Sequence, residues 1–211
     1  MIPKLHYISQ GNSPKIHLDN ILNACASGAE LVVLDIQNSS EKKFLKIATK
    51  AREITAHFQT RLIINAHIKL AKDLKVDGIH IDTTSDCPTS LRKNLHSWQL
   101  IGASANTLQD CQSFINKEVD YLYLSPFKAT EDTHATELGL NGYTAINEAL
   151  QTETPIIGVG GIKITDVAAI LETGISGIGV SDEITHDFNS IKIFNQLLTA
   201  SSTEERRYTF E

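Results

Sequence analysis

The sequence has few cysteines, no long apolar run and no excess of basic residues, and each shortage excludes a class of protein. Its three cysteines, Cys25, Cys87 and Cys111, form no Cys-x-x-Cys pair, so we expect neither a disulfide framework nor a zinc site. No window approaches 18 uninterrupted apolar residues and no basic-then-apolar leader opens the chain, which predicts a cytoplasmic protein without a membrane segment. With 19 Lys and Arg against 25 Asp and Glu, the formal charge is −6, and no basic stripe indicates nucleic-acid binding.

What remains is the composition of a globular protein. Of 211 residues, 41% are hydrophobic and 21% are charged, which is enough apolar mass to bury a core. The length lies at the lower edge of what an eightfold α/β barrel needs, roughly 200 to 250 residues.

Short β-branched runs recur at nearly even spacing, and each is followed by a helical pattern or a helix-start signal. Continuously apolar strands alternating with helices predict a parallel sheet covered by helices. We therefore expect a single (β/α)8 TIM barrel of minimal size, one domain over residues 1–211 with a polar tail from about residue 200. An open doubly wound sheet is the alternative, but no G-x-G-x-x-G follows the first strand. The predicted strands are Leu5–Ile8, Leu31–Ile36, Leu62–Asn65, Gly78–Ile81, Leu100–Ala103, Tyr121–Leu124, Ile156–Val159 and Gly177–Val180.

Capping residues predict where the helices begin and end. Gly28 closes a helix over Leu18–Ala26, and the Asn38–Ser40 run precedes a helix over Glu41–His57. Between the sixth strand and the next helix, Ser125–Leu138 is polar and aperiodic, which is typical of a functional or mobile loop. The other predicted N-caps are Thr107, Thr165 and Asp187.

The glycine pair Gly160-Gly161 is the strongest single functional signal. In such barrels the reacting groups follow the strand ends, and the loops after strands seven and eight commonly bind a phosphate. Two glycines after a buried strand bring backbone N–H groups close to an anion, and Lys163 lies just beyond. The alternative is that the pair only forms the turn into the next helix.

Polar side chains at other strand ends are further candidates. Asp35 lies in an apolar strand and must be paired or face a polar cavity, which a barrel mouth provides. Asn65 either hydrogen-bonds a heterocycle or caps a helix. His80 and Asp82 point to the same face of their strand. They could form an acid/base pair, a metal site or a structural pair, and the sequence offers no third ligand at a spacing typical of a metal site. Lys128 either closes over a ligand or is a solvated lysine.

Several segments carry a resemblance to a known family. They are LHYIS at 5–9, LIINAHIKLA at 62–71, VDGIHI at 76–81, IGASANTLQD at 101–110, VDYLYLSPF at 119–127, TPIIGVGGI at 154–162 and ILETGISGIGV at 170–180. In order and spacing the chain resembles the thiamine-phosphate synthase and TenI-like barrels. The resemblance implies a small phosphorylated heterocycle as ligand, such as a thiazole phosphate, and Mg²⁺ is expected of that family. A homodimer is the commonest assembly of soluble proteins.

The family's active-site motifs differ here. Its Gln-x-Arg-x-Lys run after strand two corresponds to Val33, Asp35 and Gln37, and its Asn-Asp-Arg after strand three to Asn65-Ala66-His67. The resemblance thus implies that the magnesium-binding Asp is absent, so no metal ligand and no cofactor is predicted. The second magnesium carboxylate falls near Thr84 or Ser85, with Asp86 the nearest acid.

Two further motifs are altered. The family's lysine in the loop after strand six falls near Asp132, and Lys128 is a candidate substitute. The histidine of the TenI-like Ser-x-His-Thr run corresponds to Asn106 within Ser104-Ala105-Asn106-Thr107, and an amide does not shuttle a proton.

These observations give two hypotheses. The first is a thiamine-biosynthesis enzyme, either a synthase joining hydroxymethylpyrimidine pyrophosphate to thiazole phosphate or a TenI-like protein acting on thiazole phosphate. The second is a non-catalytic binding or regulatory relative that keeps the barrel and the phosphate site. The predicted catalytic residues are Asp35, His80 and Lys128, and the predicted binding residues are Asn65, Ser104, Asn106, Ser125, Gly160, Gly161 and Ser181.

Overall fold

Eight parallel strands form a closed barrel in the computed structural model, which describes residues 2–36, 39–65, 67–82, 87–129 and 136–207, without the side chains of 201–207. Neighbouring strands pair in chain order, and β1 closes the barrel by pairing with β8, with Leu5 opposite Ile178. The predicted barrel is confirmed and the open sheet is wrong. The strands are β1 Leu5–Ile8, β2 Leu31–Leu34, β3 Arg61–Ile64, β4 Gly78–Ile81, β5 Leu100–Ala105, β6 Tyr121–Leu124, β7 Ile156–Val159 and β8 Gly177–Val180.

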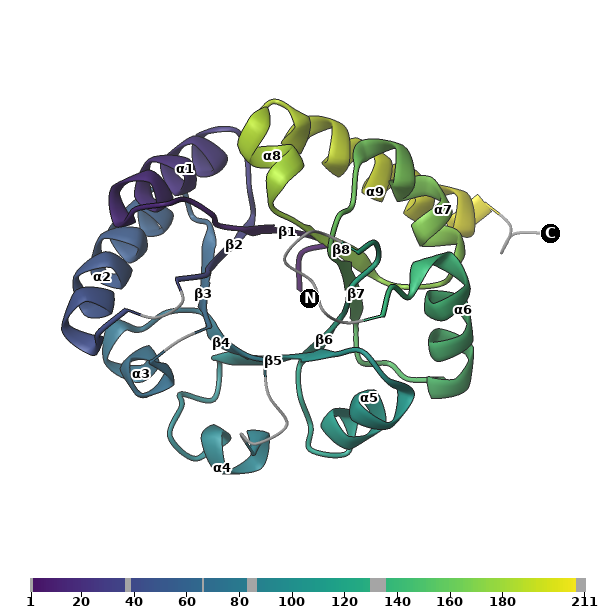
Figure 1. Cartoon of the computed structure of the whole chain (residues 1–211), viewed down its shortest axis with the longest axis horizontal. Helices are drawn as coiled ribbons and strands as arrows, with labels where there is room; N and C mark the ends of the chain where they lie inside the picture. The colour runs from purple at the N-terminus through teal and green to yellow at the C-terminus, as the bar shows by residue number, and fades with distance from the viewer. Residues whose placement is uncertain (1, 37–38, 66, 83–86, 130–135, 208–211) are drawn as a thin grey trace.

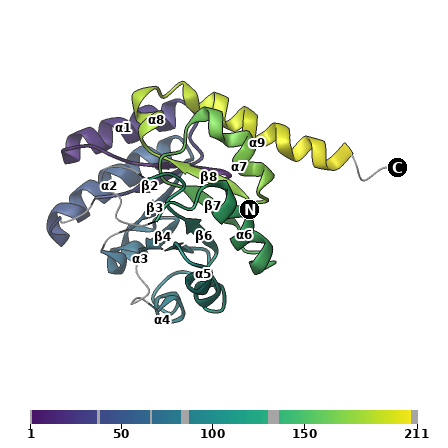
Figure 2. The same cartoon turned by 45° about the vertical axis from the view of Figure 1, so that its right-hand side comes forward.

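The helices form a ring around the barrel (Figure 1), and α9 extends beyond it towards the C-terminus (Figure 2). They are α1 Pro14–Ala26, α2 Glu41–His57, η1 Ile68–Leu70, α3 Ala71–Leu74, α4 Pro88–Arg92, α5 Leu108–Ile115, α6 Gly139–Leu150, η2 Ile164–Asp166, α7 Val167–Glu172, α8 Asp182–His186 and α9 Ser190–Arg207. Within the part of the chain that the structure describes, no helix is long and apolar enough to cross a membrane.

Three predicted strands have different ends. The strand predicted over Leu31–Ile36 stops at Leu34, and the one predicted over Leu62–Asn65 runs from Arg61 to Ile64. In both cases the next polar side chain already belongs to the barrel mouth, where strand pairing ends. The strand predicted over Leu100–Ala103 continues to Ala105, since Ser104 and Ala105 pair with Tyr123 and Leu124 of β6.

Several predicted helix boundaries are wrong. The first helix begins at Pro14 rather than Leu18, because Ser13 caps it and proline suits its first turn. Thr165 lies inside η2, where the Asp166 carboxylate accepts from the backbone N–H of Lys163 instead. Asp187 ends α8 and accepts from the N–H of Asn189, one residue before α9 begins.

Other cap predictions hold. Gly28 follows the C-cap of α1 with φ +95°, a left-handed conformation that favours glycine. Thr107 caps α5 by accepting from the N–H of Asp110. Ser40 occupies the N-cap of α2 without a side-chain hydrogen bond, and Asn38 lies outside the described residues. The polar tail from residue 200 continues α9 as far as Arg207.

The core has two parts because side chains alternate along each strand. Residues such as Tyr7, Val32 and Leu62 face outward and pack under the helices. The side chains that fill the barrel itself form the inner cluster, Leu31, Val33, Ile63, Tyr121, Tyr123, Ile157 and Val159. Gly102 makes room for this cluster, since a Cβ there would lie 2.0 Å from the Tyr121 ring. The same alternation directs the next inward position of each strand to the barrel mouth.

Candidate active site

Alternation along the strands brings the predicted polar residues to one end of the barrel. Asp35 follows the inward residues Leu31 and Val33, and Ser125 follows Tyr121 and Tyr123 in the same way. Asn65, Asp82 and Ser104 hold the equivalent positions on the three intervening strands. The carboxyl ends of β2 to β6 therefore bear the candidate site.

Asp35 and Asn65 are joined directly. The Nδ2 of Asn65 donates to Oδ1 of Asp35 over 2.5 Å, and the Oδ1 of Asn65 is buried with no hydrogen-bond partner among the described residues. Asp35 thus faces the mouth, as predicted, and Asn65 does not cap a helix, because η1 begins three residues later. A buried acceptor without a donor leaves Asn65 able to bind a ligand or an ion.

Ser9, directly after β1, and His17 of α1 support Asp35, and the sequence reasoning missed His17. The backbone N–H of Asp35 donates to Oγ of Ser9, which lies 3.1 Å from Nδ1 of His17. Burial lowers the pKa of His17, while the carboxylate of Asp35 raises it. These three residues also line a cavity of about 550 Å³ between the loops after β1 and β2.

His80 is buried below the mouth rather than exposed in it. Its side chain is 3% exposed, and Nε2 lies 2.8 Å from Oγ of Ser104 and 3.5 Å from Oδ1 of Asp82. Burial lowers the pKa of His80 to about 3, and the nearby His6 imidazole disfavours a second positive charge there, so the imidazole of His80 is neutral. Ser104 lies between His80 and Asp82, and its Oγ is 3.1 Å from Oδ1 of Asp82. Among the described residues, Ser104 and Asp82 therefore lie between His80 and the mouth, and His80 can act on a ligand through them.

Lys128 is held by an ion pair. Its Nζ lies 2.8 and 2.7 Å from the two oxygens of Asp166, and it stacks over Phe127 at 5.2 Å from the ring centre. This pairing excludes the freely solvated lysine. The sequence reasoning missed Asp166 because it is 38 residues from Lys128 and lies in η2, after a different strand.

Gly160 and Gly161 form a tight turn at the end of β7. Both have positive φ, +97° and +66°, and the Gly160 carbonyl accepts from the N–H of Lys128 at 3.0 Å. They line a cavity of about 340 Å³ together with Lys163, Ser181 and Asp182. The hydroxyl of Ser181 donates to the carbonyl of Ile8 at 2.9 Å. Its proton is therefore already used, and Ser181 would bind an anion through its backbone N–H rather than its hydroxyl.

The remaining predicted residues lie at the same end of the barrel. Ser125 follows β6, and its N–H donates to the carbonyl of Ala105 at 3.1 Å. Asn106 is exposed directly after β5. Asp86 and Asp132 lie outside the described residues. Among the residues that are described, no three His, Cys, Asp or Glu side chains gather as they would around a metal ion.

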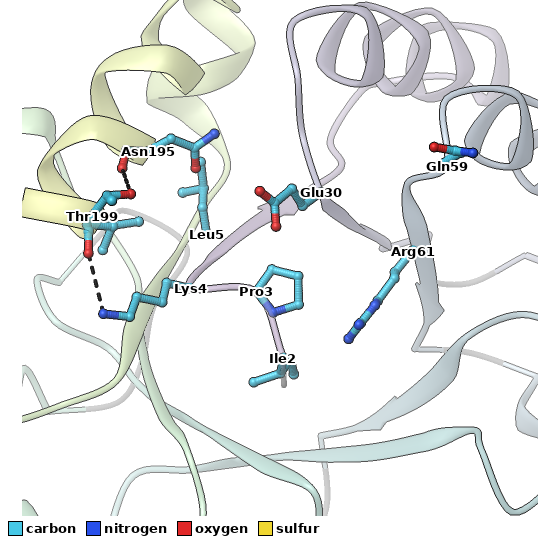
Figure 3. Close-up of a pocket in the computed structure, with 10 residues that line it drawn as sticks. Ile2, Pro3, Lys4, Leu5, Glu30, Gln59, Arg61, Asn195 and Thr199 are labelled. Carbon is cyan, nitrogen blue, oxygen red and sulfur yellow. Dashed lines mark hydrogen bonds between the residues drawn. The ribbon is translucent and has the colours of Figure 1, made fainter. Parts of the chain in front are cut away.

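The opposite end of the barrel has a separate cavity. It encloses about 560 Å³ and is lined by Lys4, Glu30 and Arg61 together with Asn195 of α9 (Figure 3). None of the predicted site residues lines it. The active sites of (β/α)8 barrels lie at the carboxyl end of the strands, so we assign the candidate site to the mouth.

The sequence decides the family. Residues 5–184 match the profile of thiamine monophosphate synthase. The chain belongs to the thiamine monophosphate synthase family. A protein of Flavobacterium johnsoniae named thiamine-phosphate synthase is 32% identical over 202 residues, which cover 93% of this chain and 95% of the relative. A Bacteroides thetaiotaomicron protein of the same name is 30% identical over 185 residues, covering 85% and 88%.

Solved structures agree on the fold. Thiamine phosphate pyrophosphorylase from Pyrococcus furiosus matches with a TM-score of 0.78 at 22% identity, covering 95% of this chain and 96% of that one. None of these relatives favours the non-catalytic alternative. In this member of the thiamine monophosphate synthase family, Asp35 stands at the position where the resemblance predicts a cation.

Proposed function

We propose that this member of the thiamine monophosphate synthase family acts in thiamine biosynthesis, joining a hydroxymethylpyrimidine pyrophosphate to a thiazole phosphate. The observation that carries the proposal is the cavity lined by Gly160, Gly161 and Ser181, at the ends of β7 and β8. Phosphate sites of (β/α)8 barrels are commonly built there. Family membership supports the same substrates.

Different residues of the mouth would bind the phosphate and orient the rings. The backbone N–H groups around Gly160 and Gly161 receive the thiazole phosphate, and Lys163 at the rim of the cavity adds positive charge. Asn65, directly after β3, and Ser104 of β5 orient the rings by hydrogen bonds. The reaction forms one C–N bond and breaks the C–O bond to pyrophosphate, so negative charge develops in a mouth that already contains Asp35 and Asp82.

The donor set beside β2 and β3 fits the Mg²⁺ that the family implies. The unpartnered Oδ1 of Asn65 and the carboxylate of Asp35 are hard oxygen ligands. One or two such protein ligands suffice when substrate phosphates complete the coordination. When bound, the ion would neutralise charge on the pyrophosphate. Asp35 would then hold Mg²⁺ at the position where the resemblance predicts the positively charged arginine of the Gln-x-Arg-x-Lys run.

The test is turnover by the purified protein with both substrates and Mg²⁺. We expect thiamine phosphate to form, and Asp35→Ala to lose turnover by a factor of roughly a hundred because charge neutralisation is lost. Asp19→Ala is the matched control, since it removes an exposed carboxylate of α1 and is expected to leave turnover unchanged.

Two outcomes would contradict the proposal in different ways. Thiazole phosphate binding in calorimetry without any product would exclude the synthase and leave a thiazole-phosphate-binding protein. Absence of binding would exclude both.

A further inference from the structure

Asp166 joins the loop after β7 to the loop after β6. Its two carboxylate oxygens accept from Nζ of Lys128 at 2.8 and 2.7 Å. The Oδ2 oxygen also accepts from the backbone N–H of Lys163 at 2.9 Å. The Asp166 side chain is only 16% exposed, whereas that of Lys128 is 42% exposed. One largely buried carboxylate therefore holds a side chain of one loop and the backbone of the other.

The backbones of the two loops are also joined to each other. The N–H of Phe127 donates to the carbonyl of Val159 at 2.8 Å, and the N–H of Lys128 donates to the carbonyl of Gly160 at 3.0 Å. These bonds continue the contact between β6 and β7 beyond the ends of both strands. Lys128 thus bonds the loop after β7 twice, through its backbone to Gly160 and through its side chain to Asp166.

The ion pair lies beside the proposed phosphate cavity rather than in its lining. Among the described residues, that lining includes Gly160, Gly161 and Lys163 but neither Lys128 nor Asp166. Nζ of Lys128 is directed to the Asp166 carboxylate, which balances its charge. The arrangement therefore differs from that of a lysine whose ammonium group binds a ligand directly.

We propose that Asp166 and Lys128 are positioning residues that hold the Gly160-Gly161 turn in the shape that binds a phosphate group. Backbone N–H groups bind an anion well only when they point at it together, so a small displacement of the turn weakens the site. The ion pair keeps the turn in place and adds no net charge beside the ligand. The effect on phosphate binding rests on the proposed function, whereas the joining of the two loops does not.

A lysine that binds the phosphate directly would give a different pattern of variants. Asp166→Ala would then release the positive charge of Lys128, and phosphate binding would become tighter. Lys128→Met would weaken binding, because the charge is lost. When the pair positions the turn, loss of either partner breaks the same contact, so both variants bind phosphate more weakly. The direction of the change in Asp166→Ala separates the two roles.

Hydrogen exchange of the unliganded protein tests the joining of the loops. The amide hydrogens of Phe127 and Lys128 should exchange roughly tenfold faster in Asp166→Ala than in the unmodified protein, because local opening becomes easier. Unchanged exchange of these two amides would overturn the proposal.

Asp120→Ala is the matched control for this experiment. The Asp120 carboxylate also forms an ion pair, with Arg92, and also accepts from a backbone N–H, that of Ile101. It lies directly before β6, at the amino end of the barrel, so its loss should leave exchange at Phe127 and Lys128 unchanged. Equal acceleration in Asp120→Ala and Asp166→Ala would show a general loss of stability and would also overturn the proposal.

Calorimetry with thiazole phosphate tests the effect on the ligand. Asp166→Ala and Lys128→Met should each bind roughly three- to tenfold more weakly, and the double variant no more weakly than either single one, since one contact is lost in all three. Lys128→Arg should bind within about twofold of the unmodified protein, because a guanidinium also pairs with both carboxylate oxygens. Asp120→Ala should leave the affinity unchanged.

Two results of the calorimetry would contradict the positioning role. One is tighter binding by Asp166→Ala, and the other is a double variant whose loss is the product of the two single losses. If the unmodified protein does not bind thiazole phosphate, the proposed function fails, while hydrogen exchange still decides whether Asp166 and Lys128 hold the turn.

Discussion

Gly160 shows how one backbone conformation shapes the mouth of the barrel. Its φ of +97° is disfavoured for residues with a side chain, and a Cβ there would lie 3.0 Å from Cα of Pro126. The turn therefore needs glycine for two reasons, backbone strain and close approach to the loop after β6. That approach lets the N–H of Lys128 reach the Gly160 carbonyl.

Gly160→Ala and Gly28→Ala separate these two reasons. Gly28 has nearly the same φ, +95°, but nothing lies within 4 Å of a Cβ there. We expect Gly28→Ala to lower the free energy of unfolding by about 1 to 2 kcal/mol through strain alone, and Gly160→Ala by roughly 1 to 3 kcal/mol more. Urea denaturation measures both, and equal losses would show that contact with Pro126 is unimportant.

The sequence predicts contacts between neighbouring strands better than contacts between loops. Asp35 and Asn65 lie at inward positions of adjacent strands, so a barrel with alternating side chains already implies their proximity. Lys128 and Asp166 meet between two loops, and no periodicity connects loop residues. The contact of His6 with Tyr123 depends on closure of the barrel, because β1 and β6 are far apart in the sequence and are not neighbouring strands.

At the scale of elements, the strands were predicted more accurately than the helices. Each strand is a short apolar run that ends where the polar mouth begins, so hydropathy alone locates it within a residue or two. A helix start depends on a side chain that bonds a free backbone N–H, and that bond is not visible in hydropathy. Ser13 forms such a bond, whereas Ser40 does not.

The caps of α5 and α2 predict different costs for similar substitutions. Thr107 accepts from the N–H of Asp110 at 3.1 Å, so Thr107→Ala should lower the free energy of unfolding by about 1 kcal/mol. Ser40→Ala removes a hydroxyl that makes no capping bond, and its effect should stay within about 0.5 kcal/mol. Thermal and urea unfolding of both variants would check this, and the reverse order of the two losses would contradict the assignment of the caps.

At the scale of the whole molecule, two histidine rings are buried inside the barrel, where most of the inner cluster is aliphatic. His6 and His80 are both buried, and burial lowers the pKa of each to about 3. In the unfolded chain both return to the ordinary value of 6.5. The fold therefore excludes two protons that the unfolded chain binds in mild acid.

The protein should consequently lose stability as the pH falls from 6.5 towards 3. In this range the unfolded chain binds more protons than the native one, so the free energy of unfolding falls by up to about 2.7 kcal/mol per pH unit for the two histidines. By pH 7.5 both are almost entirely neutral in either state and contribute little slope. Urea unfolding at pH 7.5 and 5 measures the loss, and equal stability at both values would contradict burial as neutral rings. His57→Gln, at an exposed residue, is the control and should keep the same dependence.

The pairing of β1 with β8 also has a consequence for synthesis of the chain. Leu5 is opposite Ile178, so the barrel closes through residues at nearly opposite ends of the sequence. On the ribosome, one edge of β1 has no strand to pair with until β8 has emerged, roughly ten to thirty seconds later at usual rates of translation. During that time the nascent chain exposes an apolar strand edge, the kind of surface that chaperones shield from aggregation.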